Sequence, residues 1–209
     1  MKIVAFFVRH GETDLNAPDE NGVSHFRGDA DILLNDKGKQ QADALVPYFG
    51  AHKFSQAFTS SRTRTKQTLK PLLDSKGMEP VEVPSMDSLN TGDFTGLPKT
   101  DENREKLNWY REHPEEPIPG GESVQHFRDR VDPAIMNAVN IGEESGRPTI
   151  SSIHGSVMRE ISRLFHEGDY NKVKVEPGGI VGIYKDRNGY TAKPLVKESL
   201  VDEDIPAGS

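Results

Sequence analysis

Short apolar runs alternate along this chain with longer stretches in which apolar residues recur at helical spacing. Runs at residues 3–8, 54–59 and 148–153 predict buried strands. Residues 79–86 predict an edge strand, which two prolines interrupt. Residues 180–184 and 190–194 predict a hairpin, because Asn188-Gly189 is a strong turn signal.

The helical stretches are predicted at residues 37–49, 99–113, 123 to about 141, and 157–166. Gly50 is a stop signal for the first of these helices, Pro47 bends or shortens it, and Pro133 kinks the third. A further helix follows Ser60-Ser61, two serines that suit a helix N-cap. Strands that alternate with helices predict an α/β fold with a mainly parallel sheet.

The connections between these elements are polar and rich in glycine or proline. Residues 14–31, 89–96 and 114–121 are predicted loops, and the first is long enough to suggest a functional role. Residues 1–197 are expected to form a single catalytic domain. Residues 198–209 are acidic and end in proline and glycine, which predicts a flexible tail.

Composition narrows the possible functions. The chain has 209 residues and a formal net charge of −7, which argues against nucleic acid as its partner. An anionic substrate would therefore need a local pocket of positive charge. Cysteine is absent, so a disulfide framework, a thiolate nucleophile and a zinc–cysteine site are excluded. No apolar run is long enough for a secretory signal or a membrane span, and we expect a cytoplasmic protein.

The first apolar run stops at Arg9 and His10, followed by Gly11 and Glu12. In open α/β sheets ligands bind at the carboxyl ends of the strands. A guanidinium offers a planar fork of donors that fits phosphate oxygens, and a neutral imidazole can act as a nucleophile. The alternative is an ordinary strand end, where His10 caps a neighbouring element and Arg9 pairs with Glu12.

Three predicted strand ends carry matching residues: Arg9-His10, Arg64 behind Ser60-Ser61, and His154-Gly155. If these strands are neighbours, two histidines and two arginines surround one point. Such a cluster predicts a phosphoryl pocket, in which one neutral histidine attacks phosphorus. The arginines and a protonated second histidine would stabilise charge on the non-bridging oxygens.

The motif Arg9-His10-Gly11-Glu12-Thr13 resembles the RHG signature of the histidine phosphatase superfamily, the phosphoglycerate mutase-like proteins. Further segments resemble that family in the same order along the chain, from residue 3 to about residue 184. They are Asp14-Leu15-Asn16, Asp31 with Leu34 and Gly38, residues 64–68, Gly92 to Gly96, residues 119–123 with Phe127 and Arg130, and residues 153–155 with Arg159. The resemblance implies a three-layer sandwich, with a mainly parallel central sheet flanked by helices.

The resemblance also implies roles for individual residues. His10 would become phosphohistidine, and Arg9, Arg64 and His154 would hold the phosphoryl group. Glu12 would orient the site. Substrate would contact a further set of residues: Thr13, Asn16, Arg27, Glu122 and Ser156. Arg62 remains an alternative to Arg64.

The resemblance leaves the general acid unassigned. Many family members have a glutamate four residues before the glycine that matches Gly92, but this chain has Ser88 there. The carboxyl groups nearby belong to Asp87, Asp93 and Glu122, of which we rank Asp93 first. Some members of the superfamily work with a poor acid on substrates that have good leaving groups.

The predicted function is a phosphatase that hydrolyses the phosphomonoester of a small metabolite through a phosphohistidine on His10, without a metal or cofactor. Three alternatives remain open: a phosphoglycerate mutase-type phosphotransferase, a phosphohistidine or phosphoprotein phosphatase, and a non-catalytic module that binds a phosphorylated ligand. The sequence does not indicate the oligomeric state.

Overall fold

The computed structural model describes residues 1–197 and Leu200, so the predicted tail at 198–209 lies almost wholly outside the described residues. The described residues form one six-stranded sheet in the order β3 (Pro80–Glu82), β2 (Ala57–Thr59), β4 (Thr149–Ile153), β1 (Lys2–Arg9), β5 (Ile180–Asp186) and β6 (Gly189–Val196). The first four strands are parallel, and the hairpin of β5 and β6 adds an antiparallel strand beside β1. The predicted α/β class is confirmed.

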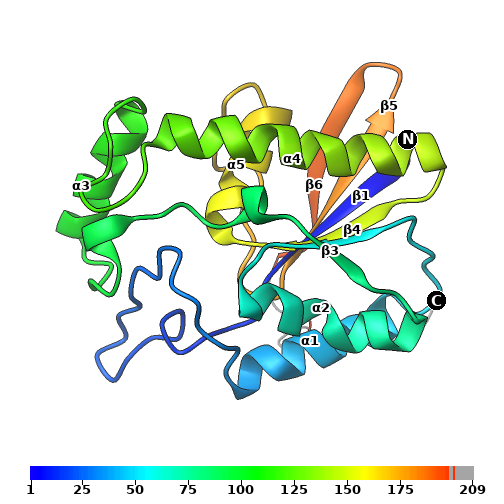
Figure 1. The fold of residues 1–209 in the computed structure, drawn as a ribbon, viewed down its shortest axis with the longest axis horizontal. Coiled ribbons are helices and arrows are strands. Elements are labelled where there is room, and N and C mark those ends of the chain that lie inside the picture. Colours follow the sequence, from blue (N-terminus) through cyan, green and yellow to red (C-terminus); the bar gives the residue numbers. More distant parts are fainter. Residues whose placement is uncertain (198–199, 201–209) are drawn as a thin grey trace.

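Helices cover both faces of this sheet and make three layers (Figure 1). One face carries α1 (Asp36–Tyr48) and α2 (Thr63–Lys76), and the other carries α4 (Val124–Ser145) and α5 (Gly155–Phe165). Helix α3 (Asp101–Glu112) lies at one end of α4 (Figure 1). Two short 3-10 turns, Pro84–Met86 and Gly92–Phe94, lie in the connection from β3 to α3. Among the described residues no helix is both long and apolar enough to cross a membrane.

The near-continuous apolar run of β1 is explained by burial on both of its faces. Phe7 packs into the cluster under α4 and α5, whereas Phe6 and Val8 pack into the cluster under α1 and α2. A strand covered on both faces needs apolar residues at every position rather than at alternate ones. The buried β1 therefore carries Arg9 and His10 to the carboxyl edge of the sheet.

Several predicted boundaries were wrong, and a proline accounts for one of the differences. The predicted strand at 79–86 is reduced to Pro80–Glu82, because Pro84 begins a 3-10 turn. Helix α4 runs through Pro133 and continues to Ser145, where Gly146 ends it in the left-handed conformation. Strand β2 holds only Ala57–Thr59 of the predicted run at 54–59.

The predicted N-cap of α2 was also wrong. Arg62, rather than a serine, stands at the N-cap position and makes no side-chain cap. The carboxylate of Asp31 replaces the missing cap, since Oδ1 accepts from the backbone N–H of Thr63 at 2.7 Å. The start of α2 thus depends on Asp31, a residue of the long loop at 14–31, and this contact brings the loop against α2.

Two glycines let the turn after β1 lie directly on the first turn of α1. A Cβ atom on Gly11 would come within 2.6 Å of the Gly38 carbonyl oxygen. A Cβ atom on Gly38 would come within 2.2 Å of the Glu12 carbonyl oxygen. Both contacts are shorter than any real Cβ atom tolerates, so this packing requires glycine on each side.

Candidate active site

The ends of three adjacent parallel strands converge, as the motifs predict. Arg9 on β1 pairs with Ile153 on β4, and Thr59 on β2 pairs with Ser152 on β4. The next residues along the chain are therefore neighbours at one edge of the sheet: His10, His154 and Ser60. The two imidazole rings lie 5.4 Å apart between centroids.

The environment of His10 fixes which ring nitrogen is free. Nδ1 lies 2.6 Å from the carbonyl oxygen of Gly11, which can only accept a hydrogen bond. Nδ1 of the neutral ring therefore carries the proton, and Nε2 keeps its lone pair. Nε2 is buried and has no hydrogen-bond partner among the described residues. His10 thus presents an unprotonated nitrogen to the pocket.

Arg64 and His154 form a second buried unit, and both side chains are fully buried. Arg64 Nε donates to His154 Nδ1 at 3.3 Å, so Nε2 of the neutral ring donates to Ser60 Oγ at 2.8 Å. Arg64 also donates to the Ala30 carbonyl oxygen at 2.5 Å, and this contact ties the guanidinium to the long loop. Ser60 is a site residue that the sequence analysis missed.

Arg9 and Arg27 complete the cationic side of the pocket. Arg9 donates through Nη1 to the Val175 carbonyl oxygen at 2.7 Å. Arg27 donates through Nη1 to Asn16 Oδ1 at 2.6 Å, and the same oxygen accepts from the Thr13 hydroxyl at 2.9 Å. The Nε atoms of both arginines are buried and have no partner among the described residues. The predicted set of Thr13, Asn16 and Arg27 is therefore brought together.

The electrostatics of the pocket favour neutral imidazoles and an anionic ligand. Burial lowers the pKa of His10 well below its usual value, and Arg27 is the largest of the neighbouring charges that lower it further. Burial and the Arg64 guanidinium likewise lower the pKa of His154 well below its usual value, so this ring is neutral rather than protonated at neutral pH. Burial also lowers the pKa of Arg64 to about 10, which still leaves it charged at neutral pH.

Among the described residues, no hydrogen bond or ion pair joins His10 to Ser88 or to any of the three candidate acids, Asp87, Asp93 and Glu122. Ser88, at the position of the family glutamate, is buried, donates to the Gly28 carbonyl oxygen at 2.6 Å and accepts from Arg64 at 3.4 Å. Asp87 accepts from the backbone and hydroxyl of Ser61. Asp93 is exposed on its 3-10 turn, and no contact among the described residues joins it to His10.

Glu122 is held by Arg130 rather than left open to a ligand. Both carboxylate oxygens accept from that guanidinium, at 2.6 and 3.1 Å. Arg130 also donates to the carbonyl oxygens of Ser85, Asp87 and Ser88. This pair therefore fixes the segment that carries Ser88, a role that the sequence analysis did not give to Arg130 although it named that residue in a family-like segment.

The remaining predicted residues surround the pocket. Ser156 Oγ accepts from the Leu89 backbone at 3.1 Å, outside the two-histidine cluster. Glu12 accepts from Asn35 Nδ2 at 3.0 Å, which links the turn after β1 to the N-cap of α1. Arg62 is partly exposed and pairs with Asp29 at 3.0 Å, so Arg64 rather than Arg62 lies against His154.

A sequence model of the histidine phosphatase superfamily (branch 1) matches residues 5–193, which is nearly the whole chain. The chain belongs to this superfamily. A 2,3-bisphosphoglycerate-dependent phosphoglycerate mutase from Bradyrhizobium sp. (strain BTAi1) is 30% identical over 207 residues, which cover 95% of this chain and 92% of the mutase.

Solved structures of the superfamily share the architecture. The phosphoglycerate mutase from Thermus thermophilus has a TM-score of 0.67 and 27% identity, over 92% of this chain and 96% of that one. The mycobacterial glucosyl-3-phosphoglycerate phosphatase has a TM-score of 0.72 over 93% of this chain and 98% of that one. Its 20% identity supports a common fold alone. Proteins named as mutases and as phosphatases thus share this phosphoglycerate mutase-like fold.

Proposed function

We propose that this enzyme is a phosphatase that hydrolyses a small phosphomonoester through a phosphohistidine on His10. His10 Nε2 donates its lone pair to phosphorus, the N–P bond forms, and the bond from phosphorus to the leaving oxygen breaks. The leaving oxygen takes a proton from solvent and departs as the alcohol. Water then attacks phosphorus, the N–P bond breaks, and inorganic phosphate leaves with His10 neutral again.

One observation carries the proposal: His10 Nε2 is unprotonated and, like the Nε atoms of Arg9 and Arg27, it has no hydrogen-bond partner in the described part of the chain. Arg9, Arg27 and Arg64 would neutralise charge on the non-bridging oxygens, and they are held in place by carbonyl and amide oxygens. Donors fixed in advance of the reaction stabilise a transition state without the cost of reorganisation. A site that only binds phosphate gains nothing from a free imidazole nitrogen.

A phosphoglycerate mutase is the second candidate, because curated relatives at 30% identity bear that name. A mutase returns the phosphoryl group from histidine to the product and excludes water while it does so. It also relies on an acid that protonates and deprotonates substrate hydroxyls. Ser88 at the acid position, with its hydroxyl committed to the Gly28 carbonyl, favours a phosphatase that acts on esters with good leaving groups.

The test is phosphate release from para-nitrophenyl phosphate in EDTA, for the wild type and His10→Ala side by side. We expect metal-independent release by the wild type and a loss of at least roughly a thousandfold in kcat for the variant, since no other nucleophile replaces the imidazole. His113→Ala removes an exposed histidine and serves as the control. Equal release by wild type and His10→Ala would exclude the mechanism.

The mutase alternative is tested on the same preparations. Conversion of 3-phosphoglycerate to 2-phosphoglycerate that depends on added 2,3-bisphosphoglycerate would favour the mutase. Release of inorganic phosphate from the same substrate, without the primer, would favour the phosphatase.

A further inference from the structure

A buried glutamine of α1, Gln41, lies against the turn that follows His10, and its side chain is only 2% exposed. Its Oε1 atom accepts from the backbone N–H of Glu12 at 2.7 Å. Helix α1 touches this turn at Gly38, where a Cβ atom would lie 2.9 Å from the Glu12 nitrogen. Residues three apart on a helix share one face, so Gln41 follows Gly38 onto the same turn. The buried amide of Gln41 therefore bonds the main chain two residues after the nucleophile.

The peptide group that Gln41 contacts is also the one that holds the His10 ring. This group joins Gly11 to Glu12: its carbonyl oxygen lies 2.6 Å from His10 Nδ1, and its N–H donates to Gln41. A trans peptide group is planar, and its C=O and N–H bonds point in opposite directions. An acceptor fixed behind the N–H therefore keeps the carbonyl oxygen turned toward the imidazole.

Gly11 makes this peptide group easy to rotate. Glycine lacks a Cβ atom and reaches backbone conformations that other residues avoid. The N–H of Gly11 itself donates to Thr68 Oγ1 at 3.0 Å, but that bond holds the preceding peptide group. The bond to Gln41 is thus the contact that opposes rotation of the Gly11–Glu12 group from its N–H side.

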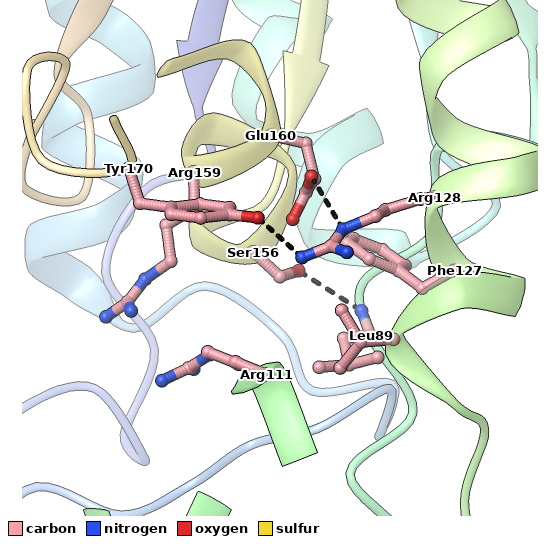
Figure 2. A pocket seen from close by; sticks show the side chains of 9 residues that line it. Leu89, Arg111, Phe127, Arg128, Ser156, Arg159, Glu160 and Tyr170 are labelled. Atoms are coloured by element: carbon pink, nitrogen blue, oxygen red, sulfur yellow. Dashed lines mark hydrogen bonds and ion pairs between the residues drawn. The ribbon is translucent and has the colours of Figure 1, made fainter. Parts of the chain in front are cut away.

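The contacts on the other face of the sheet serve different segments. Figure 2 shows Ser156 bonded to the Leu89 backbone, and Arg128 bonded to Glu160 and Tyr170. These bonds join α4 and α5 to each other and to the loops at residues 89 and 170. The turn after β1 is instead bonded by side chains from α1 and α2, on the opposite face.

We propose that Gln41 is a positioning residue for phosphoryl transfer: it keeps the Gly11 carbonyl against His10 Nδ1, so that the lone pair stays on Nε2. The inference rests on the proposed function, in which Nε2 attacks phosphorus. Gln41 acts through the main chain, and its effect is on the fraction of enzyme molecules that hold the reactive tautomer. Without its acceptor, the neutral ring can carry the proton on either nitrogen, and the Nε2–H form cannot attack.

The test is the tautomer of His10, read from long-range proton–nitrogen NMR spectra of the full chain at about pH 8, well above the ordinary histidine pKa. Among the seven histidines, the signals of His10 are those that His10→Ala lacks. We expect the Nδ1–H form in the wild type. Gln41→Met removes the acceptor but keeps a side chain of similar length, and should give a mixture of both tautomers. Gln41→Glu retains an acceptor oxygen and should restore the Nδ1–H form.

Turnover should follow the tautomer. We expect Gln41→Met to lower kcat/KM for para-nitrophenyl phosphate by roughly 2- to 13-fold, the population ratio for one neutral hydrogen bond, and Gln41→Glu to recover most of that loss. The inhibition constant of inorganic phosphate, which the arginines would hold, should stay within about twofold of the wild type. Gln40→Met makes the same exchange at the exposed neighbouring position of α1 and should have neither effect.

An unchanged tautomer or an unchanged kcat/KM in Gln41→Met would overturn the role of Gln41, as would a wild type in the Nε2–H form. An equal loss in Gln41→Glu, or an equal rise in the inhibition constant of phosphate, would also overturn it, because packing rather than the acceptor would then matter. Failure of the proposed function is a separate result: no phosphate release by the wild type, although the His10 tautomer still depends on Gln41.

Discussion

At the residue scale, a single backbone oxygen decides which ring nitrogen of His10 carries the proton. The Gly11 carbonyl, 2.6 Å from Nδ1, selects the tautomer that leaves Nε2 unprotonated. Burial, and after it the surrounding guanidinium groups, lower the pKa of His10 and oppose protonation of the ring, which keeps the nucleophile available in mildly acidic solution. The same charges attract the dianionic phosphate, so one set of arginines both activates the nucleophile and binds its target.

This arrangement predicts where activity is lost at low pH. Protonation of His10 removes its lone pair, and its lowered pKa places the acid limb of kcat/KM below pH 6.5. Arg27 is the largest neighbouring charge that lowers that pKa, so its removal raises the pKa of His10. We therefore expect Arg27→Gln to shift the acid limb to higher pH, in addition to reducing kcat/KM.

The control for this shift is Arg27→Lys, which retains the charge. Its acid limb should stay near that of the wild type even if binding is weaker. Titration of the substrate phosphate is common to all three proteins and cancels in the comparison. An acid limb that moves equally in Arg27→Gln and Arg27→Lys would show that the charge of Arg27 does not act on His10.

At the scale of the elements, glycines set how closely helices approach the sheet. Helix α4 crosses β1 at Gly142, where a Cβ atom would lie only 1.8 Å from the Val4 carbonyl oxygen. Helix α1 meets the turn after β1 at Gly38, beside the residues of the site. The first contact supports the fold at the amino end of β1, and the second positions His10 at its carboxyl end.

Substitution at the first of these contacts should cost stability without loss of function. Alanine in place of glycine favours a helix by about 1 kcal/mol. A clash with backbone at 1.8 Å should cost more, roughly 1–3 kcal/mol beyond that gain, by analogy with overpacked cores. We expect Gly142→Ala to lower Tm by roughly 2–10 °C in thermal unfolding. Well below Tm, kcat should stay within about twofold of the wild type.

Gly50→Ala is the control for this substitution, because its Cβ atom would make an ordinary 3.4 Å contact with the Pro47 carbonyl oxygen. Gly38→Ala should lower both Tm and kcat, since its clash lies beside Glu12. A Gly142→Ala protein as stable as the wild type would show that α4 can move away from β1 at little cost.

At the scale of the whole molecule, the parts of the site that lie on strand ends were predictable. The apolar run of β1 and the residues that follow it locate Arg9 and His10, and parallel pairing then brings His154 beside them. Residues held by contacts between distant loops were not predictable. Ser60 bonds to His154 across 94 positions of the chain, and Arg130 fixes Ser88 from α4.

The reason for this difference is physical. Strand position follows from local hydrophobic pattern, whereas a buried guanidinium takes whichever carbonyl or carboxylate the packed loops provide. Asp93 illustrates the limit: it lies in the glycine loop as predicted, yet its side chain is exposed on a 3-10 turn. Loop packing, rather than sequence distance, decides which carboxyl groups reach a pocket.

The measurement that tests the central claim most directly is trapping of the phosphoenzyme. A brief reaction with para-nitrophenyl phosphate, quenched in alkali, should leave a phosphoryl group that is stable in base and labile in acid, as a phosphoramidate is. Peptide mass spectrometry should locate it on His10, and His10→Ala should carry none. A phosphoryl group on another residue, or turnover by a wild type that shows no bound phosphoryl group under any quench, would contradict the account.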